Sequence, residues 1–166
     1  MTQASSSATD QAVIALIAGY FCRVAETVGL PRSVAQIYSA LFVADGPVSF
    51  TEVIDRAALS EASASTGLRL LERMKAVERV IVPGERATYY RPELSMRRLV
   101  GGFLQESLVP GLEAGGRLLD RASEAADEQL SPCLKERLSS LHRWHDLTAD
   151  LLPTLSLFDG TEILKR

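Results

Sequence analysis

Cysteine is scarce in this chain: only two residues, Cys22 and Cys133, occur among 166. Two isolated thiols are too few for the disulfide framework on which small secreted domains depend, so the composition predicts a protein of the reducing cytoplasm. We interpret each cysteine as a small apolar residue of the interior, with a redox switch as the alternative. The length predicts one domain, or one small domain with a helical extension.

An excess of positive charge is also lacking. Eighteen Lys and Arg against 21 Asp and Glu leave a net charge of -3, so the average composition gives no sign of a nucleic-acid partner. The window 60–98 differs, because eight basic and five acidic residues make it +3 and leave -6 for the rest of the chain. An acidic protein with one phosphate-facing surface is expected to show this asymmetry.

No stretch resembles a membrane-spanning or secretory segment. The apolar run at residues 12–22, AVIALIAGYFC, is shorter than the roughly 20 residues that span a bilayer, and no basic residue precedes it. We interpret residues 10–28 as a buried helix that begins near Asp10. Residues 1–9 are small and polar, and are expected to form a disordered tail. No membrane partner is expected.

Catalytic motifs are missing too. The sequence has no nucleophile–base arrangement, phosphate loop or pair of catalytic carboxylates, so we expect neither an enzyme nor a cofactor. The segment HRWH at 142–145, followed by Asp146, could place two histidines on one helix face. No third ligand accompanies them, so ordinary histidines are the preferred interpretation and a metal site is not predicted.

Helical patterns fill the middle of the chain. Apolar residues recur at three- and four-residue steps over 31–44, and SFTE at 49–52 is a capping box that opens a short helix over 49–57. Ser60 is placed to cap a further helix over 60–75. Two β-rich stretches, 77–84 and 85–92, then flank Pro83-Gly84 and predict a β-hairpin. The order predicts a helix-turn-helix followed by a wing.

The helix over 60–75 has two contrasting faces. At 3.6 residues per turn its inward face is apolar, and its outward face is hydroxylic at the start and cationic further on. Small residues and the helix dipole favour close approach to an anion, and Ser, Thr and Arg contact phosphates and base edges. We therefore predict a DNA-reading face, with a solvated helix face as the alternative. The inward residues are Ala64, Leu68, Leu71 and Met74; the outward ones are Ala62, Ser65, Thr66, Arg69 and Arg73.

Three segments carry a family resemblance: GLPRS at 29–33, LSEASASTGLRLLE at 59–72, and VPGERATYY at 82–90. Together they make the stretch 29–93 resemble MarR-type winged-helix regulators, and most of all their GbsR-like branch. The resemblance implies a homodimeric transcriptional regulator, expected to be a repressor, on palindromic double-stranded DNA. A winged helix that contacts proteins without binding DNA is the alternative. The candidate DNA-binding residues are Arg32, Ser63, Ser65, Thr66, Arg69, Arg73 and Arg86, the last at the wing tip.

Residues 94–166 are expected to be helical and to form the dimer together with residues 10–28. A helix is predicted over 93–109, a kink or break near Pro110 and the glycines at 111, 115 and 116, and a final long helix opened by Ser131-Pro132. The apolar stripe of that last helix is longer than one small winged helix can cover, and a monomeric helical cap is the alternative. The stripe contains Leu134, Leu138, Leu141, Trp144, Thr148, Leu151, Leu152 and Leu155. The fold class is thus mainly α with a small β-hairpin wing.

The resemblance also suggests a small-molecule effector, and its betaine branch suggests a quaternary ammonium compound. Such a cation binds in an aromatic cage. Five candidates are expected near the junction of the DNA-binding and dimerisation parts: Tyr20, Phe21, Tyr38, Phe103 and Trp144. Ordinary core packing of these rings is the preferred interpretation, because aromatic residues at helical spacing usually pack in a core.

Overall fold

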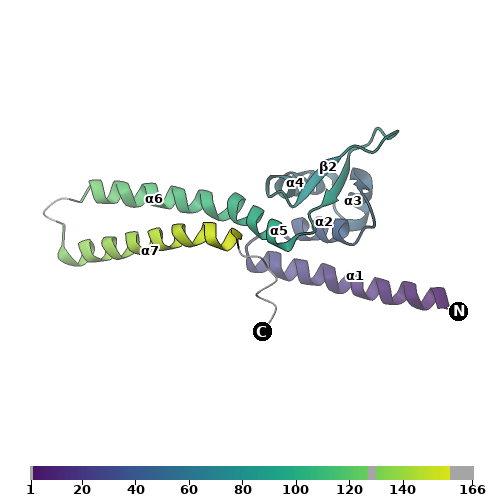
Figure 1. Cartoon of the computed structure of the whole chain (residues 1–166), viewed down its shortest axis with the longest axis horizontal. Helices are drawn as coiled ribbons and strands as arrows, with labels where there is room; N and C mark the ends of the chain where they lie inside the picture. The colour runs from purple at the N-terminus through teal and green to yellow at the C-terminus, as the bar shows by residue number, and fades with distance from the viewer. Residues whose placement is uncertain (1, 127–129, 158–166) are drawn as a thin grey trace. The chain divides into compact units, whose positions relative to one another are not determined.

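The computed structural model describes residues 2–126 and 130–157. The chain divides into two compact units, Met1–Leu94 and Ser95–Arg166. Both are mainly helical, and the first also contains a three-stranded antiparallel sheet (Figure 1). A mainly α fold with a small sheet is what the sequence predicts.

The first unit follows the predicted order of elements. It contains α1 (Thr2–Thr27), α2 (Arg32–Phe42), β1 (Val48–Ser49), α3 (Phe50–Ala57), α4 (Glu61–Arg73), β2 (Val77–Val80) and β3 (Tyr89–Pro92). Strands β2 and β3 form the predicted hairpin, in which Val77 pairs with Pro92 and Val80 with Tyr89. The two-residue strand β1 was not predicted; it pairs with the outer side of β3, so the sheet order is β1-β3-β2.

Local capping positions α3 and α4. The Ser49 side chain accepts from the Glu52 amide, and the Glu52 carboxylate accepts from the Ser49 amide at 3.1 Å, so the predicted capping box is confirmed. Ser60 caps α4 as predicted, because its Oγ accepts from the Ser63 amide. Between the helices, Ala58 adopts a left-handed φ of 52°, which keeps the turn short.

The core of the first unit lies between α2, α3, α4 and the sheet. Ile37, Leu41 and Val53 are fully buried there. The inward face of α4 is as predicted: Ala64, Leu68, Leu71 and Met74 are each at most 2% exposed.

Gly67 has a packing role in α4. A Cβ built on it would lie 2.4 Å from Cδ1 of Ile37 in α2, so glycine lets this side chain pack directly against α4, and any larger residue would require it to shift. The missing side chain at this position therefore serves the contact between α2 and α4.

The prediction of a disordered tail over residues 1–9 is wrong, because α1 begins at Thr2. Asp10 consequently lies inside the helix and does not cap it. Residues 2–9 contain neither glycine nor proline, and a helix nucleated by the apolar residues that follow can extend through them. The other end is as expected: Gly29, at φ 75°, follows the helix, and the Leu30 amide donates to the Ala25 carbonyl at 2.8 Å.

By length and composition alone, Ala8–Thr27 of α1 would be long and apolar enough to cross a bilayer, with a mean hydropathy of 1.2. The apolar stretch is thus longer than the run at 12–22 on which the sequence prediction rests. One such helix near an N-terminus is weak evidence, because a core helix of a soluble protein passes the same test. The expectation of a buried helix over 10–28 is wrong for most of α1, because only 6% of this window is buried: Ala25 is buried, and the Phe21 ring packs on Tyr38 of α2.

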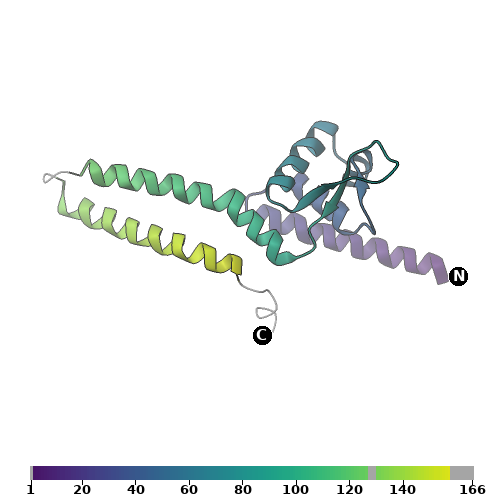
Figure 2. The ribbon, with the colours of Figure 1, turned by 45° about the horizontal axis from the view of Figure 1, so that its top comes forward.

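The second unit is a helical hairpin. It contains α5 (Met96–Phe103), a π-helical turn η1 (Leu104–Leu108), α6 (Val109–Glu124) and α7 (Pro132–Leu157). Helices α6 and α7 run side by side (Figure 2). The Ser131 hydroxyl accepts from the Leu134 amide at 3.3 Å, so the predicted start of α7 is confirmed.

Of the predicted kink or break near Pro110, the break is absent: a π turn at Leu104–Leu108 precedes Pro110, and the helix continues beyond it. Pro110 is the second residue of α6, which follows the π turn directly, so its missing N–H and its ring fall where the regular α-helical ladder is already interrupted. The glycines at 111, 115 and 116 do not end the helix. Gly116 leaves room for the His145 ring of α7, because a Cβ on it would lie 2.7 Å from Nε2 of His145 and this ring would have to move.

Candidate nucleic-acid interface

The outward face of α4 combines hydroxyls and cations. Thr66, Arg69 and Arg73 are exposed, while Ser63 and Ser65 are half-buried. The N-terminal half of this helix is thus small and polar, with its free amides at the same end, and it is followed by two arginines at a four-residue step.

Two of the predicted hydroxyl contacts already have partners within α4. The Ser60 hydroxyl donates to Ser63 Oγ at 3.0 Å, which extends the N-cap. Arg69 donates from Nη2 to Ser65 Oγ at 3.2 Å, one helical turn before it. Ser65 therefore orients the Arg69 guanidinium, and Thr66 is the exposed hydroxyl of the face.

The wing carries arginines in two different situations. Arg79 on β2 makes a bidentate ion pair with Glu72 of α4, in which its Nη2 lies 3.0 Å from Glu72 Oε2. Arg91 on β3 pairs with Glu78, which is its cross-strand partner in the register. The two strand arginines are thus neutralised by neighbouring carboxylates, and the Glu72 hydrogen bond raises the pKa of Arg79 further.

The Glu72–Arg79 pair also connects the wing to α4. Arg79 pairs in register with Tyr90, which is 5% exposed, so the ion pair lies at the edge of the core. Burial raises the pKa of Tyr90, and the positive charge of Arg79 opposes that rise. The sequence has no signal for this contact, because seven residues and a turn separate its partners.

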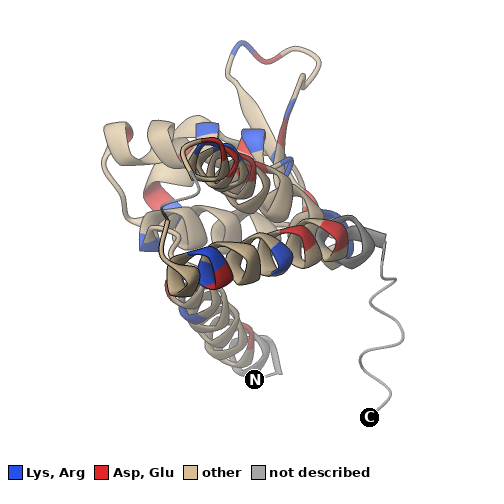
Figure 3. Ribbon diagram, turned by 90° about the vertical axis from the view of Figure 1, so that its left-hand side faces the viewer, with Lys and Arg blue, Asp and Glu red and all other residues tan. Residues whose placement is uncertain are grey.

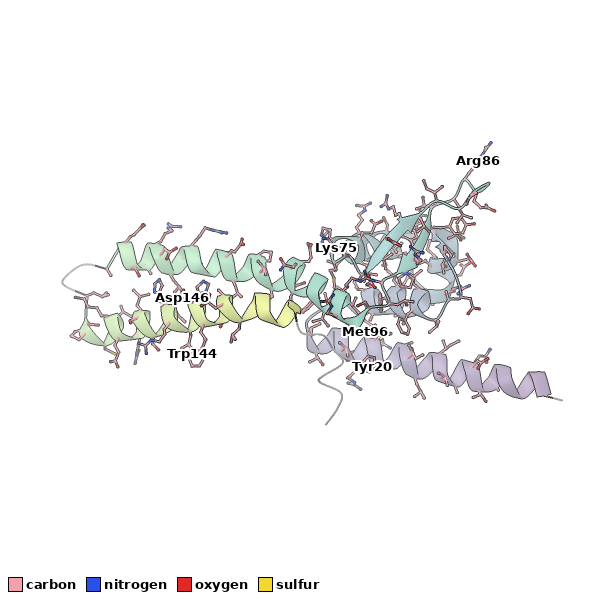
Figure 4. All side chains as sticks on the ribbon, viewed as in Figure 1. Tyr20, Lys75, Arg86, Met96, Trp144 and Asp146 are labelled. Atoms are coloured by element: carbon pink, nitrogen blue, oxygen red, sulfur yellow. The ribbon has the colours of Figure 1, made fainter. Side chains whose placement is uncertain are left out.

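Arg86 lies in the loop between β2 and β3 and is exposed. Figure 4 shows its side chain at the tip of this loop, pointing away from the sheet. Basic and acidic segments alternate along the loop and its strands (Figure 3), so the basic window at 60–98 does not form one uninterrupted stripe. Arg32 is the exposed first residue of α2.

The aromatic candidates do not form a cage within the first unit. The Phe21 ring packs edge-on against Tyr38 and Phe42, with ring centroids 4.9 and 5.2 Å apart. The Tyr38 hydroxyl donates to the Glu93 carbonyl at 2.5 Å, and burial together with Glu93 raises the pKa of Tyr38 to about 12. These contacts favour core packing for Phe21 and Tyr38.

The side chains of the other three aromatic candidates are less closely packed. Tyr20 is 63% exposed and touches the Phe21 ring by its edge. Phe103 and Trp144 belong to the second unit; Phe103 is half-buried, and Trp144 is 65% exposed on the side of α7 that faces away from α6 (Figure 4).

Both histidines lie between α6 and α7. His142 Nε2 lies 3.7 Å from Asp120 Oδ1, and its Nδ1 lies 3.3 Å from the Leu138 carbonyl oxygen. The His145 ring lies over Gly116. Within residues 2–126 and 130–157, no group of three His, Cys, Asp or Glu side chains could hold a metal ion.

The expectation of buried cysteines is only partly met. Cys22 is half-buried in α1, but Cys133 is exposed. The reason is its position as the second residue of α7, ahead of the part of that helix whose side chains pack against α6.

Two helices present apolar faces to solvent. On α1, Leu16, Tyr20 and Val24 are 74, 63 and 42% exposed and follow one another at four-residue steps. On α7, the exposed apolar residues are Leu134, Leu141, Trp144, Leu147 and Leu151. Their neighbours Leu138, His142 and Thr148 are half-buried, so α7 has one face towards α6 and a second apolar face without a covering element among the described residues.

Comparison with known proteins gives a likeness of fold. No family model matches the chain, and no curated protein matches it. A crystal structure of a transcriptional regulator matches with a TM-score of 0.63 at 21% sequence identity, over 89% of this chain and 95% of that one. The mainly helical chain with its three-stranded sheet therefore shares its fold with a transcriptional regulator.

Proposed function

We propose that this protein is a transcriptional regulator of the MarR type, in its GbsR-like branch, that binds palindromic double-stranded DNA as a homodimeric repressor. The observation that carries the proposal is the outward face of α4. Thr66 and Arg69 are exposed on a helix that follows α3 after a short turn and precedes a hairpin with Arg86 at its tip. This order of elements supports a winged helix in which α4 serves as the recognition helix.

The side chains divide into two roles. Thr66 and Arg69 read base edges in the major groove, where arginine forms bidentate contacts with guanine. Ser63 and Ser65 support this face through their bonds to Ser60 and Arg69. Arg32, Arg73 and Arg86 contact the DNA backbone, and Arg86 also reaches the adjacent minor groove.

The exposed apolar faces of α1 and α7 support a homodimer. Side chains such as Leu16 and Leu141, which are 74 and 55% exposed, lie on long helical faces rather than singly. Burial of such a face between two copies removes apolar surface from water and gives the two-fold symmetry that a palindrome requires.

Selection from random duplexes tests the function. The protein is incubated with a library of random double-stranded DNA, the bound fraction is amplified, and the enriched site is measured by gel shift. We expect an inverted repeat with half-sites about one helical turn apart. Arg69→Ala is expected to weaken binding to this site, whereas Arg121→Ala, a change of an exposed arginine on α6, serves as the matched control. Enrichment of no sequence, or equal binding by both variants, would refute the proposed role of α4.

A further inference from the structure

We propose that Ile81 is a second DNA contact of the wing, an apolar side chain that packs against the sugars of the minor groove beside Arg86. The inference rests on the proposed function and adds to it a residue that contributes affinity without charge.

Ile81 is unusual in its exposure. It is 95% exposed, more than any other large hydrophobic side chain among the described residues. It follows directly after β2, which ends at Val80, and so lies beyond the part of the hairpin that covers the core. The side chain therefore contributes little to the fold, although isoleucine is a residue that usually packs in a core.

A tight turn places Ile81 and Arg86 together at the end of the wing. The Glu85 amide donates to the Val82 carbonyl at 3.1 Å, and Gly84 has a φ of 86°. With Pro83 before this glycine, residues 82–85 have the hydrogen bond, the residue types and the positive φ of a type II turn. Ile81 precedes the turn and Arg86 follows it.

One acidic residue, Glu85, lies in the turn next to Arg86. The Tyr89 hydroxyl is hydrogen-bonded to the Glu85 carboxylate; partial desolvation and then the charges of Glu85 and Glu52 raise the pKa of Tyr89. The arginines of the strands are paired with Glu72 and Glu78. Residues 81–86, all of which the structure describes, contain one cation, Arg86, and one anion, Glu85, and their most exposed apolar side chain is Ile81.

A cation beside an isoleucine fits the minor groove better than it fits phosphate alone. The groove attracts arginine by its negative potential, and its walls are formed by sugars, against which apolar side chains of DNA-binding proteins pack or between whose base steps they insert. A protein partner could also pack against Ile81, but it would then occupy the wing and prevent DNA from binding there.

The test separates apolar from ionic contact by salt dependence. The dissociation constant for the selected duplex is measured at several salt concentrations for the wild type, Ile81→Ser, Ile81→Leu and Arg86→Ala. Ile81→Ser is expected to bind about tenfold more weakly, which is about 1.4 kcal/mol, with an unchanged slope of log K against log salt. Arg86→Ala is expected to reduce that slope by about 0.9 for each phosphate that the guanidinium neutralises.

Ile81→Leu is the matched control, because it keeps the apolar volume and should bind within about twofold of the wild type. Thermal unfolding of all variants should coincide, since the side chain is solvent-exposed. Wild-type affinity of Ile81→Ser would overturn this inference and leave the proposed function intact. Failure of the wild type itself to bind any duplex would overturn both.

Discussion

Replacement of Gly67 by alanine is expected to destabilise the first unit, although alanine is the better helix former. In a helix interior this change alone contributes about 1 kcal/mol of stability. Here the new Cβ would lie 2.4 Å from Cδ1 of Ile37, a side chain that is 0% exposed and would have to shift within the core. Overpacking of a tight core costs about 1–3 kcal/mol, so the sum lies between near zero and about 2 kcal/mol of destabilisation.

A double-mutant cycle isolates the contact. Ile37→Val removes Cδ1 and costs about 0.5–1.5 kcal/mol by itself. The next atoms, Ile37 Cγ1 and the Val34 Cα, lie 3.9 Å from the new Cβ, which is an ordinary contact. In the Ile37→Val background Gly67→Ala should therefore stabilise by about 1 kcal/mol. The coupling energy between the two positions should be about 1–3 kcal/mol, the overpacking cost that is relieved.

Urea unfolding followed by circular dichroism measures each corner of the cycle. Gly19→Ala is the control, because Gly19 lies in α1 with no atom within 4 Å of its added Cβ, and it should stabilise by about 1 kcal/mol. If Gly67→Ala raised stability by this same amount in both backgrounds, the close crossing of α2 and α4 would be refuted.

Three further predictions concern binding, assembly and pH. Arg69→Ala should weaken specific DNA binding by about 1–3 kcal/mol. Ser65→Ala should weaken binding less in the wild type and not at all in the Arg69→Ala background. Equal effects of Ser65→Ala in both backgrounds would exclude the role of Ser65 in orienting Arg69. Leu141→Glu should convert the dimer to monomers in light scattering at micromolar concentration, because it places a charge on the exposed face of α7; an unchanged mass would contradict the dimer surface. Hydrogen bonds from the Ser49 amide and hydroxyl lower the pKa of Glu52 below 4.5, so they stabilise the fold above this pH and their contribution disappears as the pH falls through the lowered value. Glu52→Gln should flatten that part of the stability–pH profile, and an unaltered profile would show that the capping box contributes nothing to it.

The elements that could be predicted are those with local signals. Ser49, Ser60 and Ser131 each cap a helix as expected, because a cap bonds to an amide two or three residues away in the sequence. The inward residues of α4 follow from helical periodicity alone. These signals are short in range and do not depend on the rest of the fold.

Contacts between elements could not be predicted in the same way. The residue pairs Gly67–Ile37 and Glu72–Arg79 depend on how closely two elements approach, and β1 is only two residues long. The outward face of α4 could be assigned, but the partners of Ser63 and Ser65 could not. A hydroxyl that faces outward by periodicity can still bond to a neighbour on its own helix.

The π turn at Leu104–Leu108 determines which side of α6 faces α7, because it fixes the rotation of α6 about the helix axis relative to α5. Each residue of an α-helix advances the chain by about 100° around its axis, and a π turn accommodates one residue more than an α turn. Leu104 and Val109, five positions apart, are both half-buried, and both α5 and α6 contact α7. Deletion of a single residue from this turn would therefore restore an α turn and leave the phase of α6 relative to α5 unchanged, whereas deletion of a second residue would rotate α6 by about 100° and carry Gly116 away from His145. A deletion of one residue should therefore be tolerated within this turn as in the loop of the wing, but a longer deletion should not, because the number of residues between α5 and α6 fixes which side of α6 faces α7.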